Sequence, residues 1–241
     1  MTTETKKQDD FNFQTAHRVS HANIETAKPF MKNGKPQGEP KFSGLFIIEP
    51  ENPDLVRLKA EVTAMLKAKA NGKTIRARRL TEEEMNAGTF IEVTVPWKSG
   101  DKEADRLKGK NNGDDSKGAI YRGQTLLKAS SKYQPALSAI EGGKIVDFVT
   151  DEAKAVAGKK YFYSGAYIVP GFGLHWYKGD EGKPDGVSLY FNAALFAKNG
   201  PRLGGRQHNA AEAFKGYIGT ISQEDPTGGA SAEDLDDEIP F

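Results

Sequence analysis

The sequence predicts a mainly β protein with one inserted α-helix, long loops and a disordered acidic C-terminal tail. Many short segments either alternate apolar and polar residues or run apolar between Gly and Pro turns, which is typical of strands. Only the segment 53–70 has clear helical periodicity. The small barrel that habitually carries long functional loops is the five-stranded oligonucleotide/oligosaccharide-binding (OB) barrel, so we expect an OB-fold-like barrel.

Three regions divide the chain. Residues 1–14 are predicted to form a flexible N-terminal arm because they are mostly polar. Residues 15–217 contain the strand segments and predict the barrel domain. Residues 218–241 contain seven carboxylates and no basic residue, and such a segment cannot bury enough apolar surface to fold. We therefore expect a disordered tail over 218–241.

The first strands and the helix follow in chain order. The pattern predicts a strand over residues 15–27, a Gly/Pro/Lys loop over 29–40 and a buried strand over 42–48. Asn52 can cap the helix and Pro53 suits its first position. Helical spacing places four apolar residues on one face, which predicts core packing (Leu55, Leu58, Val62 and Met65).

Short strands fill most of the rest of the chain. After a strand over 90–95, the hydrophilic segment 98–117 predicts a long mobile loop. Further strands are predicted over residues 120–130, 144–150, 161–169, 173–177 and 187–191, with turns at 142–143, 158, 170–171 and 182–186. Residues 198–217 predict a closing loop with a short helix over 210–214.

Composition narrows the functional class. The 241 residues have a mean hydropathy of −0.62, and no apolar run is long enough to span a membrane. The first ten residues lack the apolar core of a signal peptide, which predicts a cytoplasmic protein. Without cysteine there is no disulfide and no thiolate zinc site. We expect neither a cofactor nor a bound metal.

Charge is distributed unevenly. The net charge is +1, but all 34 basic residues lie in 1–215 with 26 of the 33 acidic ones, so this part carries +8. A basic body followed by an acidic tail is typical of a protein that binds a polyanion.

Aromatic residues next to cations are the candidate binding residues. Single-stranded nucleic acid needs rings on which bases stack, at roughly 1–3 kcal/mol per base, and cations for its phosphates. If residues 161–169 form a strand, Tyr161, Tyr163 and Tyr167 share one face. The competing interpretation is that these rings form the barrel core. The predicted groove consists of Tyr121, Arg122, Lys128, Lys159, Lys160, Tyr161, Tyr163, Tyr167, Trp176 and Lys178.

Motifs for catalysis are missing from the sequence. Gly142-Gly143-Lys144 is followed by Ile145 rather than by Ser or Thr, so it is no phosphate-binding loop. No Gly-x-Ser-x-Gly elbow occurs, and no carboxylates have the spacing of an acid/base pair. We therefore expect a binding protein and not an enzyme.

The C-terminal residues form a candidate docking peptide. A terminal aromatic behind a carboxylate cluster suits an apolar pocket with a basic rim. The ending resembles the tail of bacterial single-stranded-DNA-binding proteins, which recruits replication and repair partners. A solubilising acidic tail is the alternative. The partner-binding residues are predicted to be Asp234, Asp236, Asp237, Glu238, Ile239, Pro240 and Phe241.

The segment 161–205 carries the most specific family resemblance. Its motifs are Tyr163-Ser164-Gly165, Gly186-Val187-Ser188-Leu189, Phe191-Asn192, Asn199-Gly200 and Leu203-Gly204-Gly205. They resemble phage-encoded single-stranded-DNA-binding proteins, a family long catalogued as a domain of unknown function and similar to the T-seven type phage protein. The resemblance covers most of residues 15–217, although the chain's ending looks like the cellular bacterial version.

The resemblance implies an OB-fold that binds single-stranded DNA with little sequence preference in replication, recombination or repair. It also implies a phage protein acting in the host bacterial cytoplasm, with the acidic tail recruiting partners and competing with DNA. Two alternatives stay open: a single-stranded RNA-binding or chaperone module, and an acidic-tailed adaptor that binds no nucleic acid. An intact edge strand could also pair two protomers into a homodimer.

Overall fold

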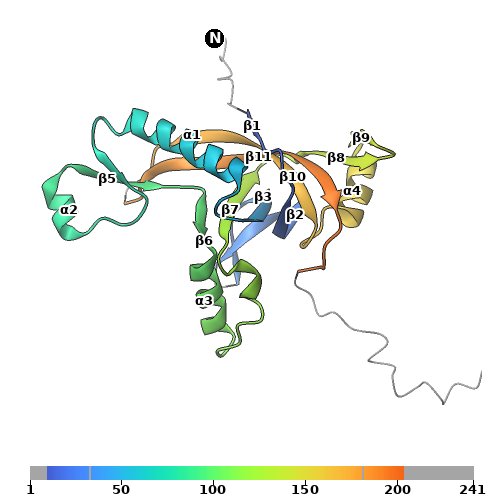
Figure 1. The fold of residues 1–241 in the computed structure, drawn as a ribbon, viewed down its shortest axis with the longest axis horizontal. Coiled ribbons are helices and arrows are strands. Elements are labelled where there is room, and N and C mark those ends of the chain that lie inside the picture. The colour runs from blue at the N-terminus through green and yellow to red at the C-terminus, as the bar shows by residue number, and fades with distance from the viewer. Residues whose placement is uncertain (1–9, 33, 181, 204–241) are drawn as a thin grey trace, which may run out of the picture. The chain divides into compact units, whose positions relative to one another are not determined.

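The computed structural model describes residues 10–32, 34–180 and 182–203, which lie in one compact unit (Figure 1). The protein is mainly β, as predicted. Its strands are β1 (Asp10–Asn12), β2 (His17–Lys32), β3 (Lys35–Ile48), β4 (Thr74–Arg76), β5 (Phe90–Thr94), β6 (Trp97–Ser99), β7 (Thr125–Ser131), β8 (Ala136–Glu141), β9 (Lys144–Phe148), β10 (Tyr167–Tyr177) and β11 (Asp185–Lys198). Its helices are α1 (Pro53–Lys69), α2 (Glu82–Ala87), α3 (Gly100–Lys110), the 3-10 helix η1 (Ala119–Tyr121) and α4 (Asp151–Lys160).

Five strand pairings form the circuit of a partly open OB-type barrel. β2 pairs antiparallel with β3, and β3 pairs antiparallel with β7. β8, which follows β7 along the chain, pairs parallel with β11. β11 pairs antiparallel with β10, and β10 returns to β2. β7 and β8 thus share the third strand position of the barrel, and α4 follows it.

The chain between β3 and β7 forms a large insertion that contains α1, α2 and α3. The predicted start of α1 is confirmed, because the Asn52 side chain accepts a hydrogen bond from the Asp54 amide and Pro53 occupies the first turn. Leu55, Leu58 and Val62 are fully buried, as the helical spacing predicted.

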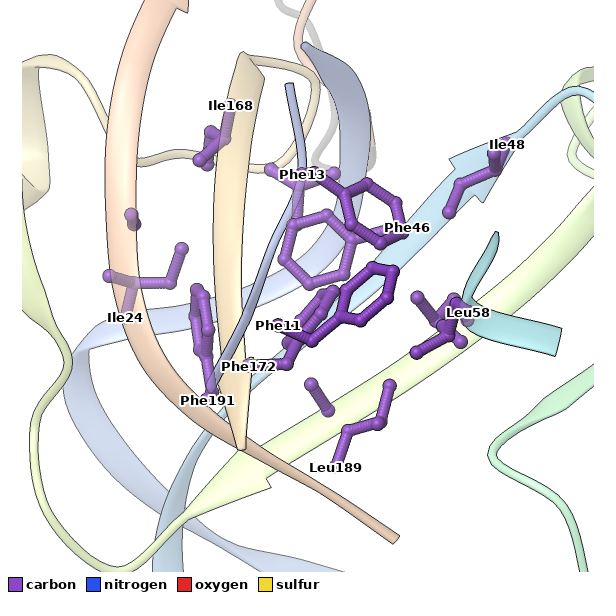
Figure 2. Packing of buried hydrophobic residues seen from close by; sticks show 14 of the residues in the cluster. Phe11, Phe13, Ile24, Phe46, Ile48, Leu58, Ile168, Phe172, Leu189 and Phe191 are labelled. Atoms are coloured by element: carbon purple, nitrogen blue, oxygen red, sulfur yellow. The ribbon is translucent and has the colours of Figure 1, made fainter. Parts of the chain in front are cut away.

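The barrel core is built around phenylalanine rings (Figure 2). Phe172 on β10 contacts Phe13, Phe46 and Phe191 with ring centroids 5.3, 5.5 and 6.3 Å apart. Leu58 from α1 lies at one side of these rings in the same view. The contacts of Phe172 with Phe13 and Phe46 are edge-to-face, and such contacts add to the free energy gained by burying each ring.

Residues 10–14 belong to this core, and their assignment to the arm was wrong. β1 pairs antiparallel with β10, and Phe11 and Phe13 are only 3% and 4% exposed. Alternation between Phe11, Asn12 and Phe13 places both rings on the inner face.

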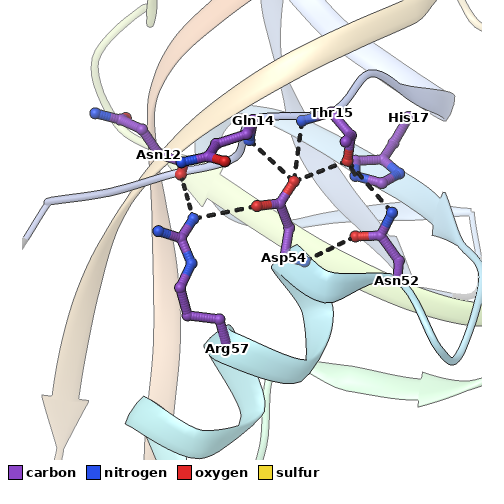
Figure 3. A network of polar contacts seen from close by, with 7 residues as sticks. All are labelled: Asn12, Gln14, Thr15, His17, Asn52, Asp54 and Arg57. Atoms are coloured by element: carbon purple, nitrogen blue, oxygen red, sulfur yellow. Dashed lines mark hydrogen bonds and ion pairs between the residues drawn. The ribbon is translucent and has the colours of Figure 1, made fainter.

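A carboxylate fixes this N-terminal strand to α1 (Figure 3). Asp54 Oδ2 accepts hydrogen bonds from the amides of Gln14 and Thr15, both at 2.9 Å, and from Thr15 Oγ1 at 2.7 Å. Arg57 binds Asp54 Oδ1 at 3.2 Å and donates to the Asn12 carbonyl at 2.7 Å. Both oxygens of this buried carboxylate therefore accept hydrogen bonds, three on Oδ2 and one on Oδ1.

Other loop and strand predictions were also wrong. The predicted loop 29–40 is the distal part of the β2–β3 hairpin, and the predicted mobile loop 98–117 contains α3, which is anchored by the buried Ala104. Residues 161–166 form turns between α4 and β10, whereas the predicted turn 170–171 lies within β10. The short helix predicted over 210–214 lies outside the described residues.

Candidate nucleic-acid interface

A groove of about 630 Å³ lies on the outer face of the barrel, where the β2–β3 hairpin meets β7 and the start of α3. Strand alternation produces its floor: Lys41 and Ser43 on β3, with Lys128 and Ser130 on β7, line the groove. Their neighbours Phe46, Leu127 and Ala129 point into the core. This face of the second and third barrel strands is the one on which OB-folds bind oligonucleotides and oligosaccharides.

Four lysines line the groove, namely Lys28, Lys41, Lys98 and Lys128. Both of its carboxylates have cationic partners. Glu39 pairs with Lys132 at 3.3 Å. Glu103 Oε2 accepts hydrogen bonds from Lys98 Nζ at 2.8 Å and Arg106 Nε at 3.0 Å, and these contacts lower the Glu103 pKa to about 2. The lysines therefore leave the groove with excess positive charge.

Two large apolar side chains are exposed in this groove. Phe30 is 63% exposed and Met31 is 54% exposed. Lys128 Nζ lies 5.9 Å from the centre of the Phe30 ring. A solvent-facing ring next to an ammonium group is the pairing on which a base can stack while its phosphate is neutralised.

His21 lines the same groove at an irregular point of β2. Its φ of 50° is unusual for a residue with a side chain, and the β2–β3 register shifts between Ser20 and Asn23. Ser20 Oγ lies 2.9 Å from His21 Nδ1 and 2.7 Å from Tyr121 Oη. Burial is the main cause that lowers the His21 pKa. The irregularity thus places the His21 imidazole at the groove, and the lowered pKa favours its neutral form.

A second hollow of about 490 Å³ adjoins the groove and shares Asn23 and Lys28 with it. It is also lined by Lys159, Tyr163 and Arg202. The Arg202 guanidinium lies 4.2 Å from the centre of the Tyr163 ring. Groove and hollow therefore form adjacent basic sites on the two sides of β2.

The structure distributes the sequence-predicted residues over several places. Lys128 lies in the groove and Lys159 and Tyr163 in the adjoining hollow. The Tyr163 hydroxyl contacts the loop after β11: it lies 3.0 Å from both Asn199 Oδ1 and the Gly200 carbonyl, either of which can accept its proton, and it accepts from the Gly200 amide at 3.2 Å.

The prediction for Tyr121 was wrong. Only 3% of this residue is exposed, and it packs with Leu45, Ala104 and Leu126 beneath α3. A ring buried in this way cannot stack on a base. Its neighbour Arg122 forms ion pairs with Asp105 and Asp115 at 2.7 and 3.0 Å, which neutralise its charge.

Tyr161 and Lys160 line neither the groove nor the hollow. Tyr161 stacks on Phe148 at 5.9 Å, and its hydroxyl donates to Glu141 Oε1 at 2.9 Å. Lys160 Nζ lies 4.6 Å from the Tyr161 ring centre. Because Tyr161 and Tyr163 are not on a strand, the alternation that placed them with Tyr167 on one face does not apply.

The remaining candidates lie on or next to β10. Tyr167 has Lys198 Nζ 4.6 Å from its ring centre and lines a small pocket with His17. Trp176 packs partly against the core, and the exposed Lys178 follows the end of β10. Neither Trp176 nor Lys178 lines the groove or the hollow.

Sequence reasoning missed Lys28, Phe30 and Lys41, because these residues lie in or directly beside the segment 29–40 that it assigned to a loop. The signal was present: Lys28-Pro29-Phe30-Met31-Lys32 repeats the pattern of an aromatic residue between cations. After α1, Arg76 and Arg78 both bind Glu84, at 3.2 and 2.6 Å, so these two basic residues have a structural role. The predicted docking residues 234–241 lie outside the described residues.

No described helix is long and apolar enough to cross a membrane. Within residues 10–32, 34–180 and 182–203, no three His, Asp or Glu side chains gather into a potential metal site.

No protein-family model matches the sequence, and no curated protein matches it. Solved structures similar to this one include the single-stranded DNA-binding protein from bacteriophage Enc34 in complex with single-stranded DNA. Its TM-score is 0.49 at 16% sequence identity, over 79% of this chain and 87% of that chain. They also include gp2.5, a single-stranded DNA-binding protein encoded by bacteriophage T7, with a TM-score of 0.48 at 13% identity over 93% of this chain and 99% of that chain. Both are phage single-stranded-DNA-binding proteins, the class that the motifs of residues 161–205 resemble.

Proposed function

We propose that this protein binds single-stranded DNA without sequence preference and protects it in replication, recombination or repair. The observation that carries the proposal is the groove on the outer face of β3 and β7, with its four lysines and the exposed Phe30. Lysines contact phosphates and a ring stacks on any base, so this combination favours binding without sequence readout. The proposed role is binding alone.

The proposed DNA path runs along the groove and over β2 into the adjoining hollow. Lys28 and Asn23 line both sites, so one strand can contact Phe30 and Lys128 first and Tyr163 and Lys159 further along. Of the other predicted residues, Lys160, Tyr161, Tyr167, Trp176 and Lys178 stay candidates for more peripheral contacts.

Fluorescence anisotropy with a labelled oligo-dT of about 30 nucleotides tests the proposal. We expect tight binding that weakens with salt, and competition by single-stranded DNA but not by duplex. Replacing Lys28, Lys41 and Lys128 by Gln should reduce the slope of log K against log[salt] by about 2, because each lost phosphate contact contributes about 0.7. Replacing Lys67, Lys69 and Lys73 by Gln changes the net charge equally outside the groove and is the matched control.

The outcomes separate the alternatives. Stronger competition by matched RNA would favour an RNA-binding module, because only RNA presents a 2′-hydroxyl. Absence of binding at low salt would leave the acidic-tailed adaptor. Equal losses of oligo-dT affinity in both triple variants would mean that binding depends on the net charge of the protein and that the groove is not the binding site.

The acidic tail is proposed to recruit partner proteins and to compete with DNA. The proposal rests on its composition, a local polyanion ending in Ile239-Pro240-Phe241 that is tethered to a basic body. Deleting residues 224–241 should tighten oligo-dT binding at low salt. Unchanged or weaker binding would contradict the competition.

A further inference from the structure

Exposed apolar side chains concentrate on the β8–β9 hairpin and α4. Five of the eleven large apolar residues that are exposed in the described part of the chain lie between 140 and 156, namely Ile140, Ile145, Val146, Val149 and Val156. Isolated exposed apolar residues are normal, but several on consecutive segments of the chain are typical of an interaction surface.

β9 is also an edge strand. It pairs only with β8 among the described strands, through a tight turn at Gly142 and Gly143 with φ of 56° and 77°, and its residues from Lys144 to Asp147 are all exposed. Residues flanking a two-residue turn form a hydrogen-bonded pair, so alternation directs the amide and carbonyl groups of Ile145 and Asp147 outward. Unpaired groups of this kind are a template for another strand.

We propose that β9 pairs antiparallel with β9 of a second copy of this chain and joins two protomers across a two-fold axis. An antiparallel edge is self-complementary under such an axis, which is the geometry of the commonest homodimers. The proposal is independent of the function proposed for the groove.

Charge and apolar contact select one register. Centring the axis on Lys144 or on Asp147 would place like charges opposite each other, and centring it on Val146 would place Ile145 against Asp147. Centring it on Ile145 places Ile145 against Ile145 and Lys144 against Val146.

Only the register centred on Ile145 extends the apolar Ile140–Ile145 pair of the hairpin across the axis to the second copy. Ile140 lies opposite Ile145 within the hairpin, with 54% and 66% of the two residues exposed. Across the axis, four isoleucines would form one row over four strands and cover each other from water. Asp147 remains free to accept its 2.6 Å hydrogen bond from Ser138.

The test uses the full chain, which contains no cysteine. Sedimentation velocity of the unmodified protein at tens of micromolar should show a dimer. Ile145→Cys places two thiols on the axis within disulfide reach, and mild oxidation should give a covalent dimer. Val56→Cys, on α1 and 54% exposed, is the matched control for random collision and should cross-link much more slowly.

A charge on the axis tests the same interface without cross-linking. Ile145→Lys places two cations against each other and should weaken dimerisation at least tenfold, whereas Val56→Lys should leave it unchanged. Because Ile145 is exposed, neither variant should alter folding, which circular dichroism checks. A monomeric unmodified protein, a dimer insensitive to Ile145→Lys, or equal cross-linking of both cysteine variants would overturn the proposal.

Discussion

Asp54 and the groove lysines are charged groups of the same barrel, but Asp54 is buried and paired, whereas Lys28, Lys41 and Lys128 are exposed and have no carboxylate partner among the described residues. Asp54 is 4% exposed, and the N-terminal strand and α1 supply donors to both of its oxygens. Lys28, Lys41 and Lys128 are exposed, and none has a carboxylate within ion-pair distance among the described residues. A buried charge must be paired to be tolerated, whereas unpaired exposed charges are available for a ligand. With the proposed function, the first region serves stability and the second is the one proposed to bind DNA.

Removing the Asp54 carboxylate should have the largest effect. Asp54→Ala leaves the Gln14 and Thr15 amides without their acceptor and should lower the free energy of unfolding by about 2–4 kcal/mol. Urea denaturation measures this change, and Glu61→Ala, an exposed carboxylate on the same helix, is the control. Oligo-dT affinity should be unchanged where the variant is folded, and loss of affinity in folded Asp54→Ala would contradict the separation of the two regions.

The stability of the same region should depend on pH through His17. Thr15 Oγ1 donates its proton to Asp54, so a neutral His17 carries its own proton on Nε2 and donates it to Thr15. Burial lowers the His17 pKa to about 4, although the Asp54 charge opposes this shift. The unfolded chain therefore binds more protons between pH 6.5 and 4, and stability should fall by at most about 3 kcal/mol as the pH decreases through this window.

His17→Gln should flatten this dependence, whereas His175→Gln, at an exposed position, should not. Free energies of unfolding from pH 7 to 4 measure it. Asp54 and Glu103 have lowered pKa values, so their stabilisation is fully present above the ordinary carboxyl pKa and is lost as the pH falls toward the folded values. The pH dependence that they add therefore lies at the acidic end of this range and below it. Equal slopes in both histidine variants would contradict the assignment to His17.

Within the groove, Phe30→Ala should weaken oligo-dT binding by about 1–3 kcal/mol, roughly 5- to 150-fold, because a stacking surface is lost. Stability should change by less than about 0.5 kcal/mol, since Phe30 is 63% exposed. Met85→Ala on α2, 58% exposed, is the control. If Phe30→Ala greatly lowered the free energy of unfolding but left the oligo-dT affinity unchanged, Phe30 would have a structural role and not a binding role.

The smallest effect on DNA affinity is expected at Glu103, which forms ion pairs with Lys98 and Arg106 at the groove. Glu103→Gln should free Lys98 and Arg106 and tighten oligo-dT binding about three- to tenfold at low salt, with a steeper salt dependence. Glu39→Gln, whose pair with Lys132 is solvent-exposed, should have a smaller effect. Weaker binding of Glu103→Gln would mean that the carboxylate positions Lys98 for the phosphate instead of competing for it.

Short-range signals were read correctly from the sequence. Asn52 and Pro53 define the start of α1, and the spacing of Leu55, Leu58 and Val62 defines its buried face. The alternation of Asp10-Phe11-Asn12-Phe13 was equally readable, but its partner β10 lies some 160 residues later and does not show in the local pattern. Of the predicted groove residues, only Lys128 lines the groove itself.

The sequence by itself determined the β-rich composition, the capped helix α1 and the separation of a basic body from an acidic C-terminal segment, because these follow from composition, spacing and caps. Only the tertiary structure decided which aromatic residues are available to a ligand. Tyr121 precedes Arg122 and Phe30 lies two residues from Lys28 and Lys32, yet α3 covers the first ring and the distal β2–β3 hairpin exposes the second. Burial depends on what packs over a residue, and that is set by strand pairings between distant segments.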